Sequence, residues 1–218
     1  MTGTGRRLPA HPAGPRAGLA GILLTGGSSR RMGHDKAALL VDGEPLAERT
    51  ARLLELVALP VLEVGPGWTT LDATCEDPPG GGPLAAVAAG AAALRERGHE
   101  GPALVVACDL PLLSAELLDA LARRPGDDSV LPVVGGRHQP LCARWSAADL
   151  GEASARLGRG ERSLLHLPDR NRSELLDETS WPPGLDVGQL ADVDTPDDLE
   201  RLAVDWRPGR PQPAVGPS

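Results

Sequence analysis

The stretch Leu19–Ala38 reads LAGILLTGGSSRRMGHDKAA and decides the fold of this chain. Its start, Leu19–Leu24, is an apolar run that is too short for a helix and is bounded by glycines, so it predicts a buried strand. The glycines that follow allow a sharp turn and let backbone N–H groups face a ligand without an intervening Cβ. Successive N–H groups form an anion-binding hollow, to which Arg30, Arg31 and Lys36 add positive charge. The stretch therefore predicts an α/β protein that holds a polyphosphate.

Lys36 is the single lysine of the chain, because all other residues among its 22 lysines and arginines are arginine. This composition indicates a coding bias that replaces lysine with arginine. A lysine that is retained beside the glycine loop indicates a role for which arginine is less suited. Such a role is that of a compact point charge against a phosphate, because the guanidinium of arginine is planar and spreads its charge. The alternative is a surface lysine without such a role.

The length of 218 residues predicts one α/β domain at residues 18–206, between polar tails at 1–17 and 207–218 that we expect to be disordered. The N-terminal tail lacks the apolar segment of a signal peptide, and no stretch has the length of an apolar membrane span. The net charge of −8 argues against nucleic acid as a partner. We expect a monomer or a small homo-oligomer.

The cysteines are three in number and have no Cys-x-x-Cys spacing: Cys75, Cys108 and Cys142. An odd number without such spacing favours a reducing compartment, and thus the cytoplasm, over a disulfide framework or a zinc site.

Strand and helix patterns alternate along the chain, which predicts a doubly wound, mostly parallel sheet with right-handed crossovers. Gly135-Gly136 lies between two predicted strands and adds an antiparallel hairpin. Residues 168–189 show no regular pattern. The predicted strands are 19–24, 37–41 (a short extended run), 60–64, 103–108, 129–134 and 139–145, and the predicted helices are 45–57, 83–97, 115–124, 146–157, 163–167 and 196–204.

Asp109 follows directly after Ala103–Cys108, the most strand-like run of the chain. A carboxylate at the carboxyl end of a buried strand lies where open α/β sheets bind ligands. There it can hold Mg²⁺, which takes one or two carboxylates together with phosphate oxygens. The alternative is that Asp109 only caps the turn that follows.

The last signal is Asp192-Val193-Asp194-Thr195-Pro196, which precedes the final predicted helix. Thr195 suits the N-cap, Pro196 suits the first helical position, and the acids that follow suit the helix dipole. Capping leaves Asp192 and Asp194 unexplained.

Four blocks of the chain resemble the molybdenum cofactor guanylyltransferases, a family of molybdopterin-type nucleotidyltransferases, and they occur in that family's order. The first block matches Leu-Ala-Gly-Gly-x-x-x-Arg-Met-Gly-x-Asp-Lys at Leu24–Lys36, with Thr25 in place of alanine. Asp35 favours the molybdopterin branch, because sugar-nucleotide and isoprenoid relatives usually have proline there. The other blocks contain Asp77 before a Gly-Pro-Leu sequence, Cys-Asp-x-Pro around Asp109, and the segment before the last helix.

The resemblance implies a Rossmann-like nucleotidyltransferase fold and a role for each matching residue. The Gly/Pro-rich loop at Asp77 has a plain alternative as a rigid connector, and His138 has one as a solvated loop histidine. The implied nucleotide-binding residues are Leu24, Thr25, Gly26, Gly27, Lys36, Asp77 and Asp109; the catalytic residues are Arg31, Lys36 and Asp109; the Mg²⁺ ligands are Asp109 and Asp194; and the substrate contacts are His138, Gln139 and Pro140.

The implied reaction moves GMP from GTP onto the phosphate of molybdopterin and releases pyrophosphate, with Mg²⁺ as cofactor. Lys36 would neutralise the α-phosphate and Arg31 the leaving pyrophosphate. The family usually has asparagines where this chain has Asp192 and Asp194. That exchange leaves two alternatives open. The donor is CTP in one of them, and the acceptor is a sugar or lactate phosphate in the other. A non-catalytic nucleotide-binding module would not need Arg31, Lys36 and Asp109 together. The resemblance also allows contact with other molybdenum cofactor enzymes.

Overall fold

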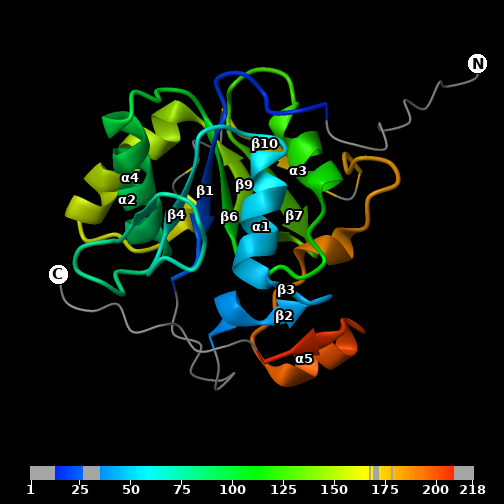
Figure 1. The fold of residues 1–218 in the computed structure, drawn as a ribbon. Coiled ribbons are helices and arrows are strands. Elements are labelled where there is room, and N and C mark those ends of the chain that lie inside the picture. The colour runs from blue at the N-terminus through cyan, green and yellow to red at the C-terminus, as the bar shows by residue number, and fades with distance from the viewer. Residues whose placement is uncertain (1–12, 27–34, 167, 169–171, 178, 209–218) are drawn as a thin grey trace, which may run out of the picture.

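The computed structural model describes residues 13–26, 35–166, 168, 172–177 and 179–208. Within them, a large sheet lies between two layers of helices, and a small sheet lies beside it (Figure 1). The large sheet contains β1 (Ala20–Leu24), β4 (Val61–Val64), β5 (Ala73–Thr74), β6 (Ala103–Ala107), β7 (Val130–Val134), β8 (Arg137–His138), β9 (Cys142–Trp145) and β10 (Glu174–Leu176). The small sheet contains β2 (Leu40–Val41), β3 (Glu44–Pro45) and β11 (Trp206–Arg207).

The helices of the described residues connect these strands. The α-helices are α1 (Leu46–Glu55), α2 (Pro83–Glu96), α3 (Ala115–Ala122), α4 (Ala147–Gly158) and α5 (Pro196–Arg201). The short 3-10 helices are η1 (Lys36–Ala38), η2 (Leu164–His166) and η3 (Val187–Leu190). Ser114 and Ser146 cap α3 and α4 with their hydroxyl groups, as their positions in the sequence predict.

The large sheet has the strand order β10-β7-β9-β6-β1-β4-β5, with β8 paired to β7. β1 is parallel to both β4 and β6, whereas β9 is antiparallel between β6 and β7. These pairings confirm the predicted doubly wound, mostly parallel sheet with an antiparallel element. The chain moves from β1 to β4 on one side and returns to β6 on the other. The carboxyl ends of β1 and β6 are therefore the place where such a sheet binds a ligand.

Both faces of β1 are buried, which explains its continuous apolar sequence. Leu23 packs with α1 and α3, whereas Ile22 packs with α2 and α4 on the other face. Gly90 allows α2 to lie close to the sheet, because a Cβ there would be 2.8 Å from the Ile22 side chain.

The small sheet has its own core and joins distant parts of the chain. β11 pairs with β2, and β2 pairs with β3 through the predicted Asp42-Gly43 turn. The buried residues of this core are Leu39, Val41, Leu46, Val193 and Leu199. This core brings the segment before α5 next to η1, and so next to Lys36.

Several predicted boundaries differ from the structure. The extended run predicted at 37–41 begins with η1 and becomes a strand only at Leu40, and Pro45 lies in β3 as the N-cap of α1 rather than inside the helix. The strand predicted at 139–145 is shortened to β9, and β8 lies just before the predicted start. The region 168–189, predicted to be irregular, contributes β10, which is parallel to β7 at the edge of the sheet.

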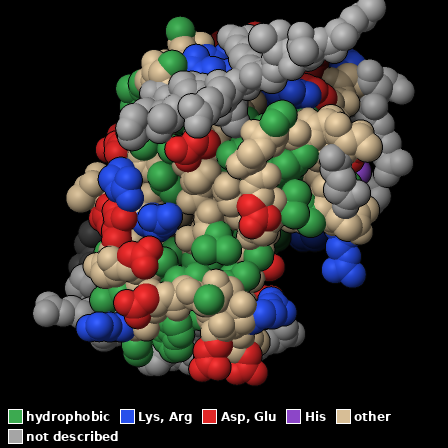
Figure 2. Space-filling model, turned by 90° about the vertical axis from the view of Figure 1, so that its right-hand side faces the viewer, with side chains coloured by type: hydrophobic (Ala, Val, Ile, Leu, Met, Phe, Trp, Pro, Cys, Tyr) green, Lys and Arg blue, Asp and Glu red, His purple; other side chains and the backbone are tan. Residues whose placement is uncertain are grey.

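The predicted tails lie mostly outside the described residues, and their described parts make contacts. The Arg16 guanidinium donates to the Ala122 carbonyl and pairs with Asp127 at 2.7 Å, while Arg207 pairs with Leu40. None of the helices in the described ranges is both long and apolar enough to cross a membrane. Figure 2 shows one face of the molecule, where acidic and basic side chains are interspersed among apolar ones.

Candidate active site

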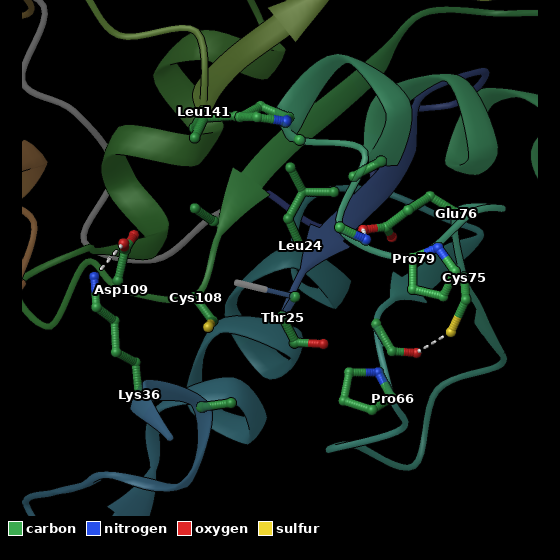
Figure 3. A pocket seen from close by; sticks show the side chains of 18 of the residues that line it. Leu24, Thr25, Lys36, Pro66, Cys75, Glu76, Pro79, Cys108, Asp109 and Leu141 are labelled. Carbon is green, nitrogen blue, oxygen red and sulfur yellow. Dashed lines mark hydrogen bonds and ion pairs between the residues drawn. The ribbon is translucent and has the colours of Figure 1, made fainter. Parts of the chain in front are cut away.

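A cavity of about 740 Å³ opens at the carboxyl ends of β1, β4 and β6, where the strand order predicts a ligand (Figure 3). This volume is within the range of small-molecule sites. Its walls include the turn after β4, the loop before α2, and η1. The predicted nucleotide-binding residues that line it are Leu24, Thr25, Gly26, Lys36 and Asp109.

Other predicted site residues have different positions. Asp77 is exposed and is not part of the cavity wall, whereas the preceding Glu76 is. The predicted substrate contacts at 138–140 lie just outside the wall, which the next residue, Leu141, joins. Gly27 and Arg31 lie outside the described residues.

Lys36 connects two predicted blocks that are far apart in the sequence. Its Nζ lies 3.2 Å from Oδ2 of Asp109 and 2.5 Å from Oδ1 of Asp194. Burial by itself lowers the pKa of Lys36, but hydrogen bonds to Asp194 and Asp109 and their negative charges outweigh it and raise the pKa. Lys36 is therefore a fixed cation at one end of the cavity (Figure 3).

Asp109 lies at the end of β6, as the sequence predicts, and its backbone holds the acidic segment in place. The Val193 N–H donates to the Asp109 carbonyl at 3.1 Å. This bond brings carboxylate oxygens of Asp109, Asp192 and Asp194 within 4.8 Å of one another. Burial raises the pKa of Asp109, and the charge and hydrogen bond of Lys36 oppose that rise.

This set of donors fits a magnesium ion. Three carboxylates offer hard oxygen ligands at the edge of a cavity that can admit phosphate oxygens, which complete the preferred shell of Mg²⁺. Thr195, by contrast, has the predicted structural role, because it forms a capping box with Asp198 at the start of α5.

Several carboxylates near the cavity are absent from the predicted site, Asp35 and Asp192 among them. Glu76 lines the cavity, and Glu63 is completely buried within β4. A charged residue in the apolar run Val61–Val64 is the sequence signal that could have identified Glu63, since unpaired charges are almost never fully buried.

The comparison with known families agrees with this geometry. The model of the MobA-like NTP transferase domain matches residues 21–175. A relative from Opitutus terrae, described as a probable molybdenum cofactor guanylyltransferase, is 40% identical over 154 residues, covering 67% of this chain and 75% of the relative. A relative from Mycobacterium tuberculosis H37Rv with the same description is 33% identical over 187 residues, covering 82% of this chain and 92% of the relative.

The fold is shared with solved structures as well. The molybdopterin-guanine dinucleotide biosynthesis protein A from Archaeoglobus fulgidus superposes with a TM-score of 0.67 at 23% identity, covering 84% of this chain and 95% of that chain. A 2-C-methyl-D-erythritol 4-phosphate cytidylyltransferase from Thermus thermophilus has a TM-score of 0.55 at 18% identity, covering 84% of this chain and 97% of that chain. The chain belongs to the MobA-like NTP transferase family and is a nucleotidyltransferase of the molybdenum cofactor guanylyltransferase type.

Proposed function

We propose that this enzyme transfers GMP from GTP to the phosphate of molybdopterin in the molybdenum cofactor. An oxygen of the acceptor phosphate attacks the α-phosphorus, the bond from that phosphorus to the bridging oxygen breaks, and pyrophosphate leaves. The observation that carries the proposal is Lys36, which lies between Asp109 and Asp194 at one end of a nucleotide-sized cavity. The descriptions of the relatives support GTP and the acceptor.

Positioning and charge explain how the site could work, because nucleotidyl transfer needs no covalent intermediate with the protein. Gly26 follows β1 at the cavity wall and, with Gly27 and the N–H groups that come after it, would hold the phosphates. Lys36 would neutralise charge that develops on the α-phosphate. Arg31 keeps its predicted role at the pyrophosphate.

Mg²⁺ would orient and polarise the phosphates, and Asp109 and Asp194 would hold it, with Asp192 as a further ligand. Asp192 and Asp194 replace asparagines that are usual in the family, so this chain would bring more negative charge to the ion. The expected consequence is tighter binding of Mg²⁺ at this position. The cytoplasm remains the proposed location, since Cys75, Cys108 and Cys142 are all free thiols.

The same exchange supports a second candidate, in which CTP is the donor or a sugar or lactate phosphate the acceptor. The experiment is to measure pyrophosphate release with GTP, CTP, ATP and UTP, each with molybdopterin and with the alternative acceptors, in the presence of Mg²⁺. We expect release with GTP and molybdopterin. Release with CTP instead would favour the second candidate. A raised melting temperature with nucleotide but no release with any acceptor would indicate a binding module.

Asp194→Asn restores the residue that is usual in the family and tests the metal assignment. We expect this variant to remain active but to need about three- to tenfold more Mg²⁺ for half-maximal rate, because an amide oxygen lacks the charge of a carboxylate. Unchanged Mg²⁺ dependence would remove Asp194 from the ligand set.

A further inference from the structure

Glu63 is a carboxylate with no exposed surface, located inside β4. It accepts five hydrogen bonds. The Thr25 hydroxyl donates at 2.5 Å, and the backbone N–H groups of Gly67, Trp68 and Thr69 donate at 3.0, 2.8 and 2.9 Å. The Thr69 hydroxyl donates at 2.8 Å. These bonds connect the end of β1 to the whole turn that follows β4.

The backbone N–H groups of Gly67, Trp68 and Thr69 can only donate, and both carboxylate oxygens face at least one of them, so the position needs a side chain that accepts through both of its terminal atoms. An ionised carboxylate has this property, whereas a glutamine would place its own N–H₂ group against other donors. Burial of a charge is costly unless hydrogen bonds compensate it, and here they do so on both oxygens. The environment of Glu63 is therefore that of a residue that fixes the positions of the groups that donate to it.

The structure that Glu63 organises is one wall of the cavity. Thr25, Gly65 and Pro66 line this wall, and the Thr25 N–H also donates to the Val64 carbonyl at 3.1 Å. Gly65 fits against Thr25 because it has no side chain: a Cβ there would lie 2.0 Å from the Thr25 hydroxyl oxygen. The Cys75 thiol donates to the Gly65 carbonyl at 3.1 Å and closes the wall on its other side (Figure 3).

We infer that Glu63 is a positioning residue that fixes the wall of Thr25, Gly65 and Pro66, and that this wall sets how tightly the nucleoside part of the substrate binds. Lys36 and Asp109 lie at the opposite side of the cavity in Figure 3. Loss of the Glu63 carboxylate thus acts on binding and leaves the charged end intact. The inference rests on the proposed function in one respect, which is that the ligand is a nucleoside triphosphate.

The test is Glu63→Gln, assayed for nucleotide transfer over a range of GTP concentrations. We expect KM for GTP to rise about tenfold or more with kcat within about threefold of wild type, the pattern of lost uniform binding. The matched control is Asp149→Asn, because Asp149 is also a buried carboxylate that accepts from Ser129 and Ser146 but does not line the cavity. It should lower the melting temperature without changing KM.

A milder variant and a nucleotide-independent measurement complete the test. Thr69→Val removes one donor to Glu63 from outside the cavity, and we expect a smaller rise in KM in the same direction. Hydrogen exchange without nucleotide should be faster at the amides of Gly67, Trp68 and Thr69 in Glu63→Gln. Unchanged KM, or unchanged exchange at these amides, overturns the inference. A wild type that transfers no nucleotide contradicts the proposed function, while faster exchange at these amides still supports Glu63 as the residue that fixes the wall.

Discussion

The two ends of the cavity are built on opposite electrostatic principles. At one end a single buried carboxylate, Glu63, accepts five hydrogen bonds from the protein. At the other end Lys36 is shared by Asp109 and Asp194, whose side chains are 26% and 55% exposed. The first network is complete within the protein, whereas the second is open to solvent and to ligand.

Because of this difference, Glu63 fixes the shape of the cavity wall, whereas Lys36 supplies the charge for the reaction. Removal of one partner from a buried network leaves donors unsatisfied and costs about 1–3 kcal/mol for each group. Lys36 lines the cavity, so phosphate oxygens that enter it can replace the carboxylate oxygens as partners of the ammonium group. Lys36 can therefore turn from carboxylates to phosphates, while Glu63 keeps its partners. Substitutions at the Lys36 end should therefore act mainly on turnover, whereas those at the Glu63 end should act on stability and on KM for the nucleotide.

The largest effect should follow Lys36→Ala. We expect turnover to fall by at least about 100-fold, as for other lost charge stabilisers, with nucleotide binding partly retained. The melting temperature should fall as well, because the Lys36 side chain is only 17% exposed and its loss removes the cation between the carboxylates of Asp109 and Asp194. Initial rates measure the turnover, and nucleotide titrations measure the binding. Lys36→Arg keeps the charge and should recover only part of the rate. A fully active Lys36→Ala enzyme would contradict the assigned role.

Asp109→Asn should reduce Mg²⁺-dependent turnover by at least about tenfold, since the amide removes the negative charge that a divalent ion needs. Aspartate and asparagine cap turns almost equally well, so a merely structural Asp109 would tolerate this change. Rates measured against Mg²⁺ concentration distinguish the two roles, with circular dichroism as the control for folding. If Asp109→Asn had wild-type rates at every Mg²⁺ concentration, the role of Asp109 would be to cap the turn and not to bind the metal.

At the other end, Gly65→Ala should act on stability first. The added Cβ would lie 2.0 Å from the Thr25 hydroxyl oxygen, and we expect overpacking to cost about 1–3 kcal/mol. Thr25→Ala removes that oxygen, so the double variant should lose less stability than the sum of the two single variants. Urea unfolding of wild type, both single variants and the double variant gives the coupling free energy. Strict additivity of the two changes would show that the two residues do not meet as described.

The smallest effect is a difference in thiol reactivity. Burial raises the pKa of Cys142 to about 12 and that of Cys108 further still, so at pH 8 neither forms the reactive thiolate. Cys75 is exposed and lines the cavity. We expect a maleimide to modify Cys75 alone in the native protein and GTP with Mg²⁺ to slow that reaction. Equal labelling with and without nucleotide would place the ligand away from this wall.

Local sequence patterns alone determined the central strands, most of the helices and the positions of Lys36 and Asp109. Leu19–Leu24 and Ala103–Cys108 are continuous apolar runs, because their strands are buried on both faces of the sheet. Ser114, Ser146 and Thr195 mark their helix starts through hydrogen bonds within three residues. Signals of this kind depend on neighbours in the chain, so the sequence by itself is sufficient to reveal them.

Only the tertiary structure revealed the strands and contacts that depend on residues far apart in the sequence. β10 is a three-residue strand that exists through its pairing with β7, and the small sheet gains its third strand because Trp206 pairs with Val41. The Lys36–Asp194 pair joins residues 158 positions apart, and no local pattern encodes that distance. Glu63 gains its role only when β1 and the turn after β4 present five donors to one carboxylate. The sequence names the charged groups, but folding determines which of them meet, because hydrogen bonds and ion pairs act over a few ångströms of space rather than along the chain.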